Sequence, residues 1–263
     1  MDNIDIIKDL ANKVSYEAPR DYISGRITEY DLRAANINCL KHLGLISDNE
    51  YNYFLNLPKW NREVEVGHLQ RENISIYNAI SDEIKRVKYN FLVANHIDPS
   101  SIVRIANDAV YINSFINLQY LFFDDTYEFR IKGQYNVMMR LGKNITLFVR
   151  LDDNNYDVDV KGINDNKLFL HESFLSFLCN IIFNIERVGI KEAIKLYNDF
   201  YEKYVKRELD INYYREFNAA SLYRHKSGFL MSQIQDVKDL RIDYNLYLLR
   251  ELWSILLSLT KIK

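Results

Sequence analysis

The spacing of apolar positions changes twice along the chain and divides it into three regions. Up to residue 98 apolar side chains recur at helical spacing, and the clearest stripe consists of Ile76, Ile80, Ile84, Val87 and Phe91. A short extended stretch, Gly25 to Tyr30, interrupts this pattern. The first region is therefore predicted to be mainly helical.

From Ser101 to Gly162 the spacing becomes that of β-strands. Segments rich in β-branched and aromatic residues are separated by turn-forming Asn, Asp and Gly. These segments are 102–106, 109–123, 127–141, 145–151 and 156–163. We expect them to form a meander-like antiparallel sheet.

The helical period returns after Leu168. It is visible over residues 174–188, 190–209 and 237–259. Helices, then a sheet, then helices predict an α+β fold, in which an antiparallel sheet packs with helices and a helical C-terminal region follows. The predicted division places an α+β core in residues 1–165 and the helical region in residues 166–263.

Composition indicates a soluble, unexported protein. A chain of 263 residues can bury a full core without disulfides, and Cys39 and Cys179 each lie in an apolar helical pattern typical of structural thiols. The N-terminus has acidic residues before any apolar run, and no run of about 18 apolar residues occurs. We therefore expect a cytoplasmic protein that does not enter membranes.

Charge and residue usage narrow the picture further. The formal net charge of -2, from 34 basic and 36 acidic residues, gives no overall attraction to nucleic acid, so such binding requires a local patch. Asn, Ile, Lys and Tyr are abundant, whereas only 3 Pro and 8 Gly occur. This usage is typical of AT-rich coding sequences, as in many phages and low-GC bacteria. We expect a phage-type protein in a bacterial host cell.

Several common chemistries have no motif in the sequence. There is no phosphate-binding P-loop, no Gly-rich dinucleotide fingerprint, no nucleophile elbow and no His pair at i,i+4 spacing for zinc. What remains is carboxylate chemistry.

Two aspartates stand at predicted strand ends. Asp31 follows a strand at 27–30 and precedes a helix, and Asp108 lies in the Asn107-Asp108 turn between two strands. Each also has an ordinary structural explanation, because Asp31 could cap the following helix and Asn-Asp is a common turn pair.

Residues 27–115 resemble the palm domain of right-hand template-dependent polymerases, of the reverse-transcriptase type or like phage DNA polymerases. DLRAAN at 31–36 is similar to the first palm motif, and RIANDAVYI at 104–112 is similar to the acidic hairpin of these enzymes. VGHLQRENISIYNAI at 66–80 is similar to their Gly-x-x-Gln loop and the long helix after it.

The resemblance implies a magnesium-dependent nucleotidyltransferase that acts on nucleic acid and nucleoside triphosphates. Asp31 and Asp108 would bind Mg²⁺ or Mn²⁺, with Asn107 assisting, because two such ions stabilise the attacking and leaving oxygens in nucleotidyl transfer. Within the segment 58–71, the residues expected to hold the substrate are Lys59, Arg62, Gln70 and Arg71. The alternative for this segment is a solvated loop.

The sequence also departs from the palm pattern. Asn107 stands where the related enzymes have a second acid, so the hairpin carries one negative charge. Only 30 residues precede Asp31. Either the fingers are reduced to residues 46–73, with a partner protein supplying what is missing, or the palm serves another use. Basic residues and tyrosines in 203–226 fit either a nucleic-acid-binding thumb or an ordinary helix surface.

Three functions follow from this pattern. The first is the nucleotidyltransferase, and the second is a non-catalytic nucleic-acid-binding or protein-interaction module that keeps the palm shape. The third is a metal-dependent nuclease that uses the same carboxylates. The remaining acidic pairs, Asp124-Asp125 and Asp152-Asp153, are predicted to be turn residues.

Overall fold

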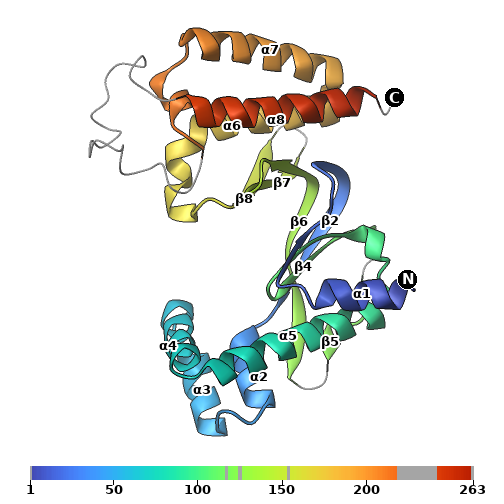
Figure 1. Ribbon diagram of the computed structural model, residues 1–263, viewed down its shortest axis with the longest axis vertical. Coiled ribbons are helices and arrows are strands. Elements are labelled where there is room, and N and C mark those ends of the chain that lie inside the picture. The colour runs from blue at the N-terminus through green and yellow to red at the C-terminus, as the bar shows by residue number, and fades with distance from the viewer. Residues whose placement is uncertain (1, 116–117, 124–125, 153–154, 218–241, 262–263) are drawn as a thin grey trace. The chain divides into compact units, whose positions relative to one another are not determined.

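The computed structural model describes residues 2–115, 118–123, 126–152, 155–217 and 242–261. The chain divides into two compact units. The first comprises Met1–Pro19 and Arg26–Gln134, and the second comprises Arg20–Gly25 and Tyr135–Lys263. Figure 1 labels most of the helices and strands of both units. Strands β2 (Tyr22–Leu32) and β6 (Tyr127–Leu141) each contribute residues to both.

The first unit combines a sheet with five α-helices in its described part. The helices are α1 (Asn3–Ala11), α2 (Ala35–His42), α3 (Asp48–Asn56), α4 (Lys59–Glu72) and α5 (Ile74–Ala94). The shorter strands are β1 (Ser15–Glu17), β3 (Ile102–Ala106), β4 (Ala109–Asn113) and β5 (Phe122–Phe123). The strand order is β1-β3-β4-β2-β6, and β5 pairs with β6.

Strand β4 lies between β2 and β3, and this placement organises the first unit. It pairs antiparallel with β3 across a tight hairpin and antiparallel with β2, so β2 and β3 run in the same direction. The helices α2 to α5 make the connection from β2 to β3. The result is a split β-α-β unit, in which a third strand is inserted between two parallel ones.

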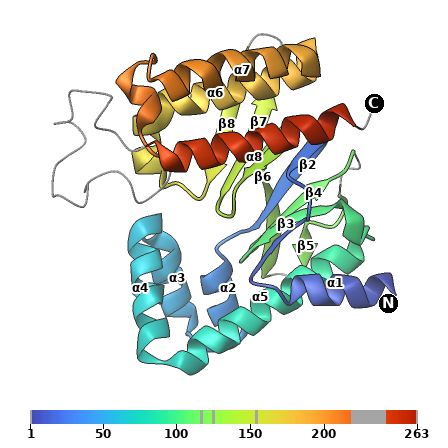
Figure 2. The same ribbon diagram turned by 45° about the horizontal axis from the view of Figure 1, so that its top comes forward.

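The predicted apolar stripe of α5 forms the core of the first unit. Ile80, Ile84, Val87 and Phe91 are buried, and the Phe91 ring stacks on Phe129 of β6 with 4.1 Å between ring centroids. Figure 2 shows α5 running beneath the strands of this unit, with α1 beside it. The helical prediction for this stripe is confirmed.

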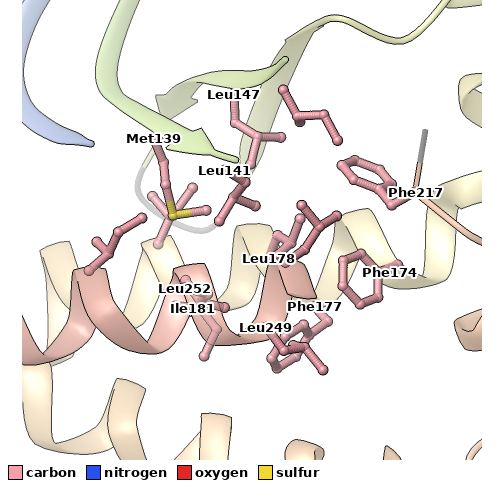
Figure 3. Packing of buried hydrophobic residues seen from close by; sticks show 14 of the residues in the cluster. Met139, Leu141, Leu147, Phe174, Phe177, Leu178, Ile181, Phe217, Leu249 and Leu252 are labelled. Carbon is pink, nitrogen blue, oxygen red and sulfur yellow. The ribbon is translucent and has the colours of Figure 1, made fainter. Parts of the chain in front are cut away.

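In its described part, the second unit places three α-helices against a small sheet. Strands β7 (Ile145–Leu151) and β8 (Tyr156–Lys161) extend the order β2-β6-β7-β8, and the helices are α6 (Glu172–Phe183), α7 (Ile190–Lys206) and α8 (Asp243–Thr260). Figure 3 shows side chains of β6 and β7 directed at α6 and α8; those labelled include Met139, Leu141, Leu147, Leu178, Ile181, Leu249 and Leu252.

The α+β class predicted from the sequence is confirmed, with two corrections to the sheet. The strands are not a simple meander, because β2 lies between β4 and β6. The strand predicted at 109–123 ends at Asn113. Its pairing with β2 runs only from Asp31 to Ile27, and a strand without a partner has no ladder to continue. The predicted boundary at residue 165, between an α+β core and a helical region, stays a prediction. Strand β6, with 15 residues, contributes to both compact units.

Among the described residues of the C-terminal region, one helical stretch, Asp165–Val188, is apolar and long enough to cross a membrane. Its residues Phe174, Leu178 and Ile181 belong to the core of the second unit. Tyr204 and Tyr214, expected among surface residues of a thumb, are buried in the same core. Tyr223, Asp124, Asp125, Asp153 and the start of the helix predicted from 237 lie outside the described residues.

Gly162, directly after β8, is predicted to be essential for the fold of the second unit. Its φ is +98°, and an added Cβ would lie 1.7 Å from the Asn144 carbonyl oxygen. Gly162→Ala should lower the free energy of unfolding by more than ~3 kcal/mol, since a backbone clash adds to the strain of positive φ. Gly44→Ala is the control: its φ is +65° with no atom within 4 Å, so it should cost only about 1–2 kcal/mol. Equal losses in urea denaturation would contradict this.

Candidate functional site

A pocket of about 460 Å³ opens in the first unit, where the end of β2 lies beside the β3–β4 hairpin. Its size is within the usual range for small-molecule sites. Residues from β2, α2, α4, the hairpin turn and β6 form its wall: Asp31, Leu32, Ala34, Ala35, Asn36, Ile37, Lys59, Arg62, Glu63, Val66, Asn107, Asp108, Arg130 and Lys132.

Asp31 lies in the wall of this pocket and does not cap the following helix. The residue preceding α2 is Ala34, in the left-handed conformation with φ 47°, and no side chain caps the helix there. The Asp31 side chain is 15% exposed. Its carboxylate lies 3.3 Å from Arg130 Nη2 and 3.8 Å from Lys132 Nζ. The capping interpretation of Asp31 is therefore wrong.

Asp108 occupies the hairpin turn and also lines the pocket. Ala106 pairs with Ala109, so Asn107 and Asp108 form a two-residue loop, and Asn107 has a left-handed φ of 50°. The Asn107 amide donates to the Val14 carbonyl at 2.7 Å, and the Asp108 carbonyl accepts from the Leu32 amide at 3.1 Å. The bond to Leu32 attaches the turn to the end of β2, and the bond to Val14 attaches it to the residue before β1.

The two carboxylates interact electrostatically. Burial raises the pKa of Asp108, and the negative charge of Asp31 raises it further. Lys132 and Lys88 act in the opposite direction. Two acids brought together in a partly buried site favour a bound cation, because a cation offsets both the desolvation and the repulsion.

The segment expected to be a Gly-x-x-Gln loop is part of α4. Lys59, Arg62, Glu63 and Val66 line the pocket at the spacing of one helix face. Gln70 and Arg71 do not line it, and Arg71 Nε instead donates to the Gly67 carbonyl at 3.1 Å. The loop prediction is wrong because Gly67 costs only about 1 kcal/mol inside a helix, so a single Gly does not end one.

Two basic residues of β6, Arg130 and Lys132, belong to the site and were not identified from the sequence. Both form ion pairs with acids of β2: Arg130 with Asp31 at 3.3 Å and Lys132 with Glu29 at 3.1 Å. Glu128, earlier on β6, pairs with Arg33, directly after β2, at 3.0 Å. In both segments a charged residue stands at every second position, which is the period of a β-strand. This spacing of charged residues could have indicated Arg130 and Lys132 from the sequence, but only the pairing of β2 with β6 shows which acids they face.

The charges that line the pocket favour an anionic ligand together with a cation. Four cationic side chains, Lys59, Arg62, Arg130 and Lys132, stand against three acids, Asp31, Glu63 and Asp108. Arginine and lysine heads at such a rim are typical phosphate ligands.

The carboxylates fit one hard divalent cation better than two. Mg²⁺ is commonly held by one or two carboxylates plus substrate phosphates, and Asp31 with Asp108 matches that requirement. Asn107 can add an amide oxygen. Within the described ranges, no three His, Cys, Asp or Glu side chains gather as a metal site. A second ion would therefore depend mostly on oxygen atoms of the substrate.

Lys88 of α5 is a buried cation near the hairpin. Its side chain is 1% exposed, and its ammonium group donates to the Lys13 carbonyl at 2.9 Å. The next carbonyl along the chain, that of Val14, accepts from Asn107. Burial lowers the pKa of Lys88 to about 8, and the charge of Asp108 partly opposes this. Lys88 thus supports the chain segment against which the turn is held.

We expect Lys88 to make stability depend on pH. The pKa of Lys88 is about 8 in the folded protein, whereas the ordinary pKa of a lysine, 10.5, applies in the unfolded chain. Between these values the unfolded chain binds more protons, so stability should rise with pH. Relative to Lys88→Met, the free energy of unfolding should increase by about 3 kcal/mol from pH 7 to 10.5. Denaturant titrations measure this, with Lys8→Met, at an exposed position of α1, as control. A constant difference between wild type and Lys88→Met would contradict the assignment.

Comparison with known proteins connects the chain to one family. A search of curated proteins found no match. A family model described as "Bacteriophage PBS1 gene 130 protein" matches residues 6–262, which is nearly the whole chain. The phage-type origin predicted from residue usage is thereby confirmed. The chain belongs to the bacteriophage PBS1 gene 130 protein family.

Proposed function

We propose that the protein is a divalent-cation-dependent nucleotidyltransferase that acts on nucleic acid or nucleotides. One observation carries the proposal: a single pocket is lined by two carboxylates from neighbouring strands and by basic side chains suited to phosphate. Nucleotidyl transfer requires both kinds of group at one place, because the cation and the phosphates must be held together.

The arrangement of the strands supports a polymerase-like palm. Asp31 is opposite Ala109 in the β2–β4 pairing, directly beside the turn that carries Asp108. In the palm domains that the sequence resembles, the two metal-binding acids likewise come from a strand end and an adjacent hairpin. Fold resemblance alone does not establish chemistry, so the proposal depends on the pocket.

Each group has a definite role in this proposal. Asp31 and Asp108 hold Mg²⁺ or Mn²⁺, with Asn107 contributing its amide oxygen, and Lys59 and Arg62 hold the phosphates. The cation supplies Lewis-acid polarisation of a phosphoryl oxygen. Asn107 in place of an acid lowers the negative charge of the site, which favours one cation over two.

The proposal extends to the surroundings of the site. Helices α3 and α4 act as reduced fingers, residues 166–263 act as a thumb, and a partner protein supplies the missing fingers. The substrates are a nucleoside triphosphate and a nucleic acid, and the protein works in the cytoplasm of the infected host. We propose no role for a membrane in this function.

Asp31→Asn and Asp108→Asn should each lower product formation about 100-fold or more, because each removes a charged ligand of the cation. The assay follows extension of a labelled primer, with and without template, in Mg²⁺ or Mn²⁺. The matched control is Asp157→Asn, whose carboxylate lies on β8 and is 73% exposed. It should retain wild-type activity, and circular dichroism should show all three variants folded.

Other outcomes would overturn the proposal. Shortening of the labelled oligonucleotide that requires Asp31 and Asp108 would indicate a nuclease. Nucleotide or oligonucleotide binding without any product would indicate the non-catalytic module.

A further inference from the structure

Arg130 and Lys132 have two relationships in the structure that compete with each other. Both line the pocket beside Lys59 and Arg62. Both also pair with acids of β2: Arg130 Nη2 is 3.3 Å from Asp31, and Lys132 Nζ is 3.1 Å from Glu29 and 3.8 Å from Asp31. The carboxylate of Asp31 thus faces cationic side chains at the place proposed for a metal ion.

These two basic side chains are able to change partners. Arg130 and Lys132 are 54% and 47% exposed, whereas the Asp31 carboxylate is fixed on a strand and 15% exposed. A long, exposed side chain loses conformational freedom when it is held in an ion pair, which offsets part of the attraction of Arg130 and Lys132 to Asp31. A ligand of higher negative charge in the same pocket therefore competes with Asp31 for the Arg130 guanidinium and the Lys132 ammonium group.

A polyphosphate has the required charge and geometry. Its adjacent phosphates present several acceptor oxygens, which a guanidinium group binds bidentately and an ammonium group binds as a point charge. Lys59 and Arg62 approach the pocket from α4, so basic groups of both α4 and β6 line it. Four basic groups around a pocket of about 460 Å³ match a chain of phosphates better than a single one.

We propose that Arg130 and Lys132 bind the polyphosphate of a nucleoside triphosphate, and that this binding withdraws them from Asp31 and frees its carboxylate for a divalent cation. The inference rests on the proposed function and deepens it. Nucleotide and cation then promote each other's binding, since coupling between two ligands is reciprocal. The basic heads also oppose a cation that arrives without the nucleotide, because like charges repel.

This mechanism makes Arg130→Gln change two affinities in opposite directions. Mn²⁺ alone should bind about tenfold more tightly, because a competing cation beside Asp31 is removed. Inorganic tripolyphosphate, measured in EDTA so that no metal takes part, should bind about tenfold more weakly, because a charged ligand group is lost. Electron paramagnetic resonance of free Mn²⁺ and calorimetry measure the two affinities on the full-length protein.

Two variants make the test specific. Arg33→Gln removes the neighbouring ion pair with Glu128, and Arg33 does not line the pocket, so both affinities should stay at wild-type values. Lys132→Gln keeps an amide beside the buried Glu29 and should repeat the Arg130→Gln result. If Lys132→Gln unfolds, the two affinities of Arg130→Gln alone test the inference.

The outcomes separate this inference from the proposed function. Unchanged affinities in Arg130→Gln, or changes in the same direction, overturn the inference even if Asp31→Asn abolishes nucleotidyl transfer. Weaker binding of a single-stranded oligonucleotide with unchanged tripolyphosphate binding also overturns it, because the basic heads would then serve the nucleic-acid backbone. Opposite shifts in an Arg130→Gln protein support the inference even if no transfer activity is found.

Discussion

The pairing of β2 with β4 is the interaction on which the candidate site depends. It runs from Asp31 opposite Ala109 to Ile27 opposite Asn113, and it inserts β4 between two strands that run in the same direction. Because the hairpin turn then lies at the end of β2, the Leu32 amide can donate to the Asp108 carbonyl. Without that pairing the two aspartates would be unrelated turn and strand-end residues.

The electrostatics of the pocket follow from strand periodicity. Side chains two residues apart lie on one face of a strand, so Glu29 and Asp31 face Lys132 and Arg130 across the β2–β6 pair. Glu29 is buried, and its pairing with Lys132 offsets much of the cost of burying a carboxylate. The same Lys132 lines the pocket, so an ion pair that stabilises the strands also sets the charge of the site.

Helix α4 shows how one segment supports a site in a way its sequence obscures. Its residues have no strong apolar stripe, and Gly67 together with mixed charges suggested a loop. As a helix, it presents Lys59 and Arg62 to the pocket and directs Gln70 and Arg71 elsewhere. Val66, which is buried and lines the same wall, is the apolar residue that holds this face against the rest of the unit.

The sequence by itself determined the α+β class, the amphipathic helix α5, the strands 127–141 and 145–151, and the strand-end position of Asp31, because these depend on local periodicity and turn residues. It also pointed to Asp31, Asn107, Asp108, Lys59 and Arg62, which the structure brings to one pocket. Only the tertiary structure decided that β2 lies between β4 and β6, that residues 59–72 are helical, and that Arg130 and Lys132 face Asp31. The physical reason is that strand partners and helix orientation depend on contacts between residues far apart in the chain, which local spacing does not specify.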